Sequence, residues 1–134
     1  MPFTPDFLPM TDLETSVQTA AECAESVLEV LGPGLSECIY QRALCEELRT
    51  RGAQVESEVI LPIRYGMHYC GFIRADVIVD SHLCLELKAK AGLTAADQVQ
   101  AGTYLRHCET LETCVLMNFG SELTVKRVER LKAD

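Results

Sequence analysis

Two short apolar segments on either side of a turn constrain this chain more than any other feature. Residues 77–79 and 83–87 are rich in β-branched residues or leucine, and residues 80–82, Asp-Ser-His, have a composition that turns easily. The pattern predicts an antiparallel hairpin that pivots on this turn. In that register Asp76, at the start of the first strand, lies opposite Glu86 on the second.

The second strand of this hairpin is predicted to divide its side chains between two environments. Because successive side chains of a strand point to opposite faces, Leu85 and Leu87 share one face, and Glu86 and Lys88 share the other. Two carboxylates, counting Asp76, and one ammonium group then converge. Like charges across a sheet are destabilising, so one carboxyl keeps its proton, the lysine compensates, or a cation lies between them. The simplest alternative is an exposed ion pair on a solvated face.

Length and composition predict a globular protein. The chain has 134 residues, the size of one domain, which is long enough to bury a core. Its 48% of hydrophobic and 24% of charged residues are typical of folded and not disordered chains. No apolar run approaches the roughly 20 residues that span a bilayer, and the first residues lack the pattern of a signal peptide. We therefore expect a soluble, cytoplasmic protein with no membrane partner.

The net charge of −8 argues against casual binding to nucleic acid, because phosphate contacts need lysine and arginine. The charge is unevenly distributed, however. Residues 1–60 contain 11 acidic and 3 basic residues, whereas residues 61–134 contain 9 of each. The half of the chain that contains the hairpin is therefore balanced, which weakens the objection.

The seven cysteines are predicted to be reduced thiols, several of them buried, because their number is odd and no C-x-x-C pair occurs. A zinc site is an alternative interpretation. Its ligands would be Cys70, Cys84 and Cys108 with either His82 or His107, but their spacing gives such a site no support.

The remaining sequence predicts helices and further strands around the hairpin. Residues 1–10 hold three of the five prolines and are expected to form an irregular arm before a single domain over residues 11–134. Thr11, with Glu14 three residues later, predicts a capped start for the first helix. The expected elements are helices over 11–31, 35–51 and 94–107, and strands over 54–61, 62–65, 68–73, 74–80, 83–89, 113–118 and 123–128.

The second predicted helix carries a carboxylate in line with its apolar face. Tyr40 and Leu44 form an apolar stripe, and Glu37 continues it one turn nearer the helix N-terminus, where negative charge is favoured. Glutamate is common in a first helical turn and needs no special role. The direction of this one, on a face that must point toward the core, makes it a candidate site residue.

The third predicted helix begins with Thr94 and Asp97, again at capping-box spacing. Gln100 and Tyr104 are four residues apart and therefore share a face. Gly102 lies between them, at a cost of about 1 kcal/mol relative to alanine, and its expected use is a close approach to the sheet.

Several of these residues form motifs that resemble those of a known family. Residues 34–40, Gly-Leu-Ser-Glu-Cys-Ile-Tyr, match the G-x-x-E-x-x-Y signature for which the GxxExxY protein family is named. Asp76, then Glu86-x-Lys88, then Gln100-x-x-x-Tyr104 resemble the motif set of the PD-(D/E)XK nuclease superfamily. The similarity covers roughly residues 12–128 and depends on the order and spacing of the motifs. One departure is Val27-Leu28, where relatives often carry Val-His, so any role of that histidine is absent here.

The resemblance implies an α/β fold with a restriction-endonuclease-like core, a mixed β-sheet flanked by helices. It also implies metal-dependent hydrolysis of a phosphodiester, with magnesium as the ion and manganese as the alternative. A divalent ion neutralises developing negative charge and activates water, and magnesium prefers carboxylate oxygens. The implied ligands are Asp76, Glu86, Glu37 and the backbone carbonyl of Leu87.

The other motif residues receive roles from the same resemblance. Lys88 would orient or help to deprotonate the attacking water, or stabilise the phosphate. Gln100 would hold the site or the phosphate, and Tyr104 would pack or contact the backbone or substrate. The remaining expected substrate contacts are Lys90, Arg74 and Tyr40.

The implied partner is nucleic acid, with DNA preferred to RNA. A homodimer is the expected assembly by analogy, because small nucleases often need a second subunit to cut both strands. The chief alternative is a catalytically silent module that uses the same fold to bind nucleic acid or protein. The position of the two carboxylates in space, in an open cleft or not, discriminates between these functions.

Overall fold

The computed structural model describes residues 11–130, and the arm expected over residues 1–10 lies outside them. In chain order the elements are α1 (Leu13–Leu31), α2 (Glu37–Thr50), β1 (Val55–Tyr65), β2 (His68–Val79), β3 (Leu83–Lys88), α3 (Ala95–His107), β4 (Thr113–Phe119) and β5 (Leu123–Glu129). The strands form one sheet in the order β1-β2-β3-β4-β5. Neighbouring strands are antiparallel except β3 and β4, which are parallel and connected through α3.

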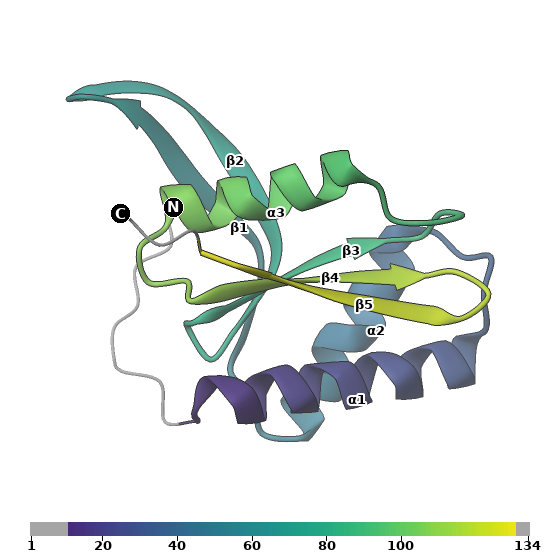
Figure 1. Ribbon diagram of the computed structural model, residues 1–134. Helices are drawn as coiled ribbons and strands as arrows, with labels where there is room; N and C mark the ends of the chain where they lie inside the picture. The colour runs from purple at the N-terminus through teal and green to yellow at the C-terminus, as the bar shows by residue number, and fades with distance from the viewer. Residues whose placement is uncertain (1–10, 131–134) are drawn as a thin grey trace.

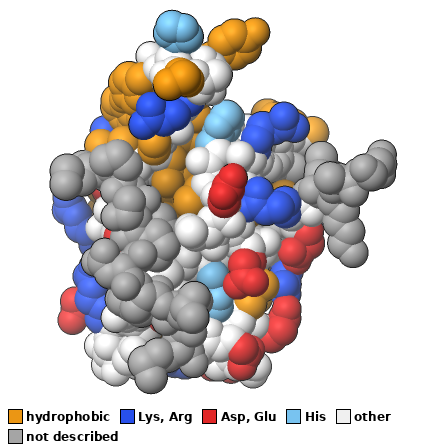
Figure 2. All heavy atoms as spheres, turned by 90° about the vertical axis from the view of Figure 1, so that its left-hand side faces the viewer, with side chains coloured by type: hydrophobic (Ala, Val, Ile, Leu, Met, Phe, Trp, Pro, Cys, Tyr) orange, Lys and Arg blue, Asp and Glu red, His pale blue; other side chains and the backbone are white. Residues whose placement is uncertain are grey.

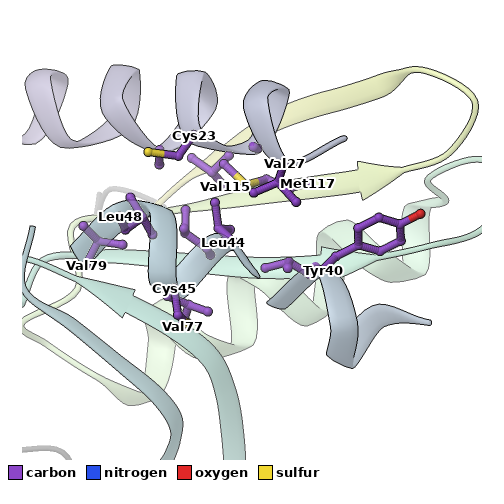
Figure 3. Close-up of a cluster of buried hydrophobic side chains, with 14 of the residues drawn as sticks. Cys23, Val27, Tyr40, Leu44, Cys45, Leu48, Val77, Val79, Val115 and Met117 are labelled. Atoms are coloured by element: carbon purple, nitrogen blue, oxygen red, sulfur yellow. The ribbon is translucent and has the colours of Figure 1, made fainter. Parts of the chain in front are cut away.

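Helices cover both sides of this mixed sheet, with α1 and α2 on one side and α3 on the other (Figure 1). The larger apolar cluster lies under α1 and α2, where Tyr40 and Leu44 are fully buried against sheet residues such as Val77 and Met117 (Figure 3). Alternate residues of β3 divide between the two sides, since Leu85 belongs to this cluster and Cys84 to the cluster under α3. The α/β architecture and the predicted alternation of β3 are therefore confirmed.

Two of the predicted helix starts need correction. Asp12 is the N-cap of α1, and its carboxylate accepts a hydrogen bond of 2.9 Å from the Thr15 amide, so the predicted Thr11 cap is wrong. Both residue types can cap, but α1 begins at Leu13, so Asp12 and not Thr11 directly precedes the first helical residue. The second helix begins at Glu37, two residues later than expected. The capping box of α3 is confirmed, with Asp97 Oδ2 accepting from the Thr94 amide at 2.8 Å.

The four strands expected over residues 54–80 form two long ones. β1 continues through Pro62, which is tolerated because β1 lies at the edge of the sheet and a proline there removes no hydrogen bond from a neighbour. Gly66 and Met67 make the predicted turn into β2. The far ends of both strands extend beyond the body of the protein and past α3 (Figure 1).

The expected close approach of Gly102 to the sheet is wrong. A Cβ added at this position would meet no atom within 4 Å. The residue instead lines a pocket of about 720 Å³ between α3 and the end of β5. The glycine is therefore not required by packing in this structure.

The cysteines do not assemble a zinc site in the part of the chain described. All seven thiols are free; Cys70 is exposed on β2, whereas Cys84 is buried in β3. Between residues 11 and 130, no three His, Cys, Asp or Glu side chains are grouped to hold a metal ion on their own. The zinc alternative is therefore wrong for the part of the chain that the structure describes. None of the helices between residues 11 and 130 has the length and apolar character needed to cross a membrane.

Candidate active site

The hairpin of β2 and β3 has the predicted register. Val77 pairs with Leu85, and Val79 pairs with Leu83, so continuing the ladder by one residue places Asp76 across from Glu86. The turn between the strands adopts left-handed backbone conformations, with φ of 51° at Asp80 and 65° at Ser81. Such angles are uncommon for residues other than glycine, and therefore need support from neighbouring groups.

A buried polar cluster supplies that support. The Ser16 hydroxyl on α1 donates to Asp80 Oδ2 at 2.7 Å and lies 3.0 Å from His82 Nε2. The other imidazole nitrogen lies 2.9 Å from Glu112 Oε2, and the second Asp80 oxygen accepts from the Gln54 amide at 3.0 Å. The turn is thus fastened to α1, to β4's preceding loop and to the chain entering β1. The sequence indicated only the turn, because these partners are far apart along the chain.

Asp76 lies where β1 and β2 depart from regular pairing. Glu58, between the residues that pair with Ala75 and Val77, has a φ of 53°. The carboxylate of Asp76 accepts a hydrogen bond of 2.9 Å from the Leu87 amide. This bond ties β2 to β3 beyond their regular ladder and holds the half-buried carboxylate at the edge of β3.

Glu86 is the most unusual group of the site. It is only 3% exposed, and its Oε2 atom has no hydrogen-bond partner. Burial, and after it the neighbouring Asp76 carboxylate, raise the pKa of Glu86 to about 9 against the opposing effects of Tyr104 and Lys88. In the absence of a bound cation, the carboxyl pair therefore retains a proton at neutral pH.

A chain of hydrogen bonds fixes Lys88 beside these acids. Lys88 Nζ donates to Gln100 Oε1 at 3.0 Å, and Gln100 Nε2 donates to the Tyr104 hydroxyl at 3.3 Å. Tyr104 in turn donates to the backbone carbonyl of Arg74 at 3.1 Å. The shared helical face predicted for Gln100 and Tyr104 thus connects the lysine of β3 to the strand that carries Asp76.

Asp97 belongs to the same polar cluster, although the sequence indicated only its capping role. Its carboxylate lies 2.6 Å from Lys90 Nζ and 4.0 Å from Lys88 Nζ. The hydrogen bond from Lys90 and that from the Thr94 amide lower the pKa of Asp97 to about 2. Lys90, a predicted substrate contact, is therefore paired with the start of α3.

The predicted metal ligands are only partly brought together. The Leu87 amide points toward Asp76, and because the N–H and C=O of one strand residue face the same edge, the Leu87 carbonyl is expected on the β2 side as well. Glu37 is exposed at the first position of α2. Within residues 11–130 it does not form a three-acid group with Asp76 and Glu86.

Tyr40 is not available to a substrate, so its predicted role is wrong. Its ring is fully buried and stacks on Phe119, with centroids 4.7 Å apart. Its hydroxyl donates to the Gly32 carbonyl at 2.6 Å and accepts from the Leu35 amide at 3.1 Å. The tyrosine therefore closes the loop between α1 and α2 and positions the start of α2.

The other two predicted substrate contacts differ in accessibility. Tyr104 is 4% exposed, which is consistent with the alternative role of packing and contacting the backbone. Arg74 is exposed, with its Nε atom 3.9 Å from Glu58 Oε2. Arg74 is thus the more accessible cation next to Asp76.

Fold and site together define a nuclease-like α/β protein, with two acids and a lysine on adjacent strands braced by a glutamine and a tyrosine of the crossover helix. The family model of the PD-(D/E)XK nuclease superfamily matches residues 14–131, and the chain belongs to this superfamily. Its mixed sheet with flanking helices is accordingly the restriction-endonuclease-like core.

Comparison with solved structures found an alkaline exonuclease (LHK-Exo) from Laribacter hongkongensis. The two chains superpose with a TM-score of 0.46 and are 16% identical over 81% of this chain and 76% of the exonuclease. Comparison with curated protein sequences gave no match.

Proposed function

We propose that this protein is a magnesium-dependent nuclease that hydrolyses phosphodiester bonds of nucleic acid, with DNA preferred to RNA. The observation that carries this proposal is the buried Glu86 carboxyl, whose Oε2 atom lacks a partner while Asp76 lies beside it. Buried polar atoms are rarely left unpaired, and each exception requires an explanation. A hard divalent cation supplies one, since it would satisfy the orphaned oxygen and remove the repulsion between the carboxylates.

The residues fit such an ion. Asp76 and Glu86 would provide carboxylate oxygens and Leu87 a backbone carbonyl, a set that suits magnesium, or manganese as the alternative. The bound ion would neutralise charge on the phosphate and lower the pKa of a water. Asp76 already has one oxygen fixed by the Leu87 amide, so the pair needs little rearrangement.

Lys88 is the proposed catalytic lysine. Its ammonium is held by Gln100 and lies on the same face of β3 as Glu86. From there it would orient the attacking water or stabilise the charge that develops on the phosphate. Gln100 acts as a positioning residue in this scheme, because it holds the ammonium and is itself bonded to Tyr104.

Within the superfamily we place the chain in the GxxExxY family on the motif at residues 34–40. Glu37 remains the proposed ligand of a second ion, directly or through water. Lys90 and Arg74 are the proposed phosphate contacts near the site. A cytoplasmic location and a homodimer that cuts both strands stay predictions.

The test is a cleavage panel of single- and double-stranded DNA and RNA with magnesium or manganese. Wild-type protein and the control Lys126→Ala, at an exposed lysine of β5, should cleave at least one substrate. Lys88→Ala should be inactive but retain its circular dichroism spectrum. Absence of cleavage by wild type on every substrate with both ions refutes the catalytic proposal.

The alternative is a silent binding module on the same fold, which the net charge of −8 favours. Metal titration by calorimetry separates the two. A nuclease should bind magnesium through Asp76 and lose that binding in Asp76→Ala, whereas a silent module, which would bind nucleic acid or a protein partner, should not need the ion.

A further inference from the structure

The projecting ends of β1 and β2 carry exposed aromatic side chains that the proposed catalytic site does not use. Tyr69 and Phe72 of β2 are 60% and 50% exposed. Figure 2 shows hydrophobic side chains at the projecting end of the molecule, with basic and histidine side chains among them. Exposed aromatic groups gathered on one part of a protein often mark a binding surface.

The register of the strands places aromatic and basic side chains on one face. Cross-strand partners point to the same face of a sheet. The pairs are Ile60 with Arg74, Pro62 with Phe72, and Arg64 with Tyr69. One face therefore carries what we term the aromatic–arginine stripe, which consists of Arg64, Tyr69, Phe72 and Arg74.

This stripe faces away from α3. The neighbouring residues Val59 and Leu61 point to the opposite face, where they are buried in the cluster that contains α3. Tyr65 also lies on that opposite face, because it follows Arg64 directly, and it is 82% exposed near the turn. The two faces of the same strand pair thus offer a matched comparison.

The charge of the stripe differs from that of the protein as a whole. Residues 59–75 contain Arg64 and Arg74 but no aspartate or glutamate, in a chain whose net charge is −8. A basic surface on an acidic protein is complementary to a polyanion. The acid that lies against the stripe is Glu58, whose Oε2 atom is 3.9 Å from Arg74 Nε, and residues 59–75 themselves add no negative charge.

The stripe is also continuous with the candidate active site. Arg74 precedes Asp76 by two positions on β2, about 7 Å along the strand, and Phe72 is about 13 Å from Asp76. Glu86 and Lys88 point to the α3 side of the sheet. The regular ladder between β2 and β3 ends at the pair of Val77 with Leu85, so a nucleic-acid strand that follows β2 from the stripe would reach the carboxylates where the two strands separate.

We propose that the aromatic–arginine stripe binds a single-stranded segment of nucleic acid and leads it to Asp76 and Glu86. This inference rests on the proposed nuclease function and specifies its substrate. Unpaired bases expose faces that stack on tyrosine and phenylalanine, while arginine contacts the phosphates. In a duplex the base faces are already stacked, and a protein reaches only base edges and phosphates. Two aromatic residues between two arginines therefore fit a single strand better than a duplex.

The test is fluorescence anisotropy with a labelled single-stranded oligothymidine in EDTA at low salt, compared with a duplex of equal length. The double variant Tyr69→Ala/Phe72→Ala should bind the single strand at least about tenfold more weakly. The variant loses the stacking of two bases, and each stacked base usually contributes about 1–3 kcal/mol to binding. The control Tyr65→Ala, on the other face, should stay within about twofold of wild type.

Three results would overturn the inference. They are a double variant that binds as well as wild type, an equal loss in Tyr65→Ala, and tighter wild-type binding to the duplex. If sedimentation shows that the double variant only converts a dimer to a monomer, the stripe is a contact between two copies of the chain. The assay needs neither metal nor cleavage, so an inactive protein with stripe-dependent binding would refute the nuclease proposal alone.

Discussion

Replacing Glu86 by glutamine should remove a pH dependence that the buried carboxyl pair imposes on folding. In the folded protein without metal, burial and the Asp76 carboxylate raise the pKa of Glu86 from 4.5 to about 9. The unfolded chain releases this proton near pH 4.5, whereas the folded protein holds it until about pH 9. The stabilising contribution is therefore complete below the lower pKa and is lost as the pH rises through the higher one.

The size of the effect follows from the width of this window. Each pH unit inside it removes about 1.4 kcal/mol from the free energy of unfolding. Between pH 5.5 and 8.0, wild-type protein should thus lose about 3 kcal/mol more than Glu86→Gln, which has no such proton. The measurement is urea denaturation of both proteins in EDTA at several pH values. The difference between their unfolding free energies cancels the groups that both share.

Magnesium provides the second arm of this experiment. An ion that replaces the proton should restore wild-type stability at pH 8.0, because it binds the folded protein and favours the ionised carboxyl. The glutamine variant should respond much less. If the two proteins show parallel pH curves in EDTA, the assignment of a buried proton to the carboxyl pair is refuted.

Three further variants test other parts of the structure. Gly102→Ala should raise the free energy of unfolding by up to about 1 kcal/mol in thermal denaturation, since the added methyl group meets no atom within 4 Å; a loss of stability would contradict this description of α3. Ser16→Ala should lower it by about 1–3 kcal/mol in urea, because Asp80 and its histidine neighbour lose a buried partner; an unchanged midpoint would show that water replaces the hydroxyl. Lys90→Met should raise the pKa of Asp97 from about 2, measured by carboxyl NMR titration, because it removes the first of the groups that lower this pKa; a constant value would assign the shift to the helix start alone.

The pairing of Asp76 with Glu86 could be predicted from the sequence because it depends on local information. Alternation in β3 and the turn at residues 80–82 determine the register, and both are visible within a short segment. The shared face of Gln100 and Tyr104 follows in the same way from helical periodicity. These features are correct because no distant residue is needed to specify them.

The predictions from sequence were wrong or incomplete where the burial of a side chain, or its contact with residues distant in the sequence, determines its role. The apolar residues of α2 showed that Tyr40 faces inward. They could not show that its hydroxyl donates a hydrogen bond to the Gly32 carbonyl, which leaves the side chain buried. Similarly, nothing local in α3 reveals that no atom lies opposite Gly102. The cluster of Ser16 and His82 joins residues 66 positions apart, so it forms only when α1 packs on the sheet.

Because the turn at Asp80 and Ser81 fixes the register of β2 and β3, the number of residues between Asp76 and Glu86 decides whether their side chains meet. An insertion of one residue that the strands absorbed would rotate Glu86 under α1 and bring a leucine to the α3 side, because side chains alternate along a strand. Such a homologue would preserve every motif letter and still lack the site. Searches for active relatives should therefore require the same number of residues between the two acids as well as the same residue types.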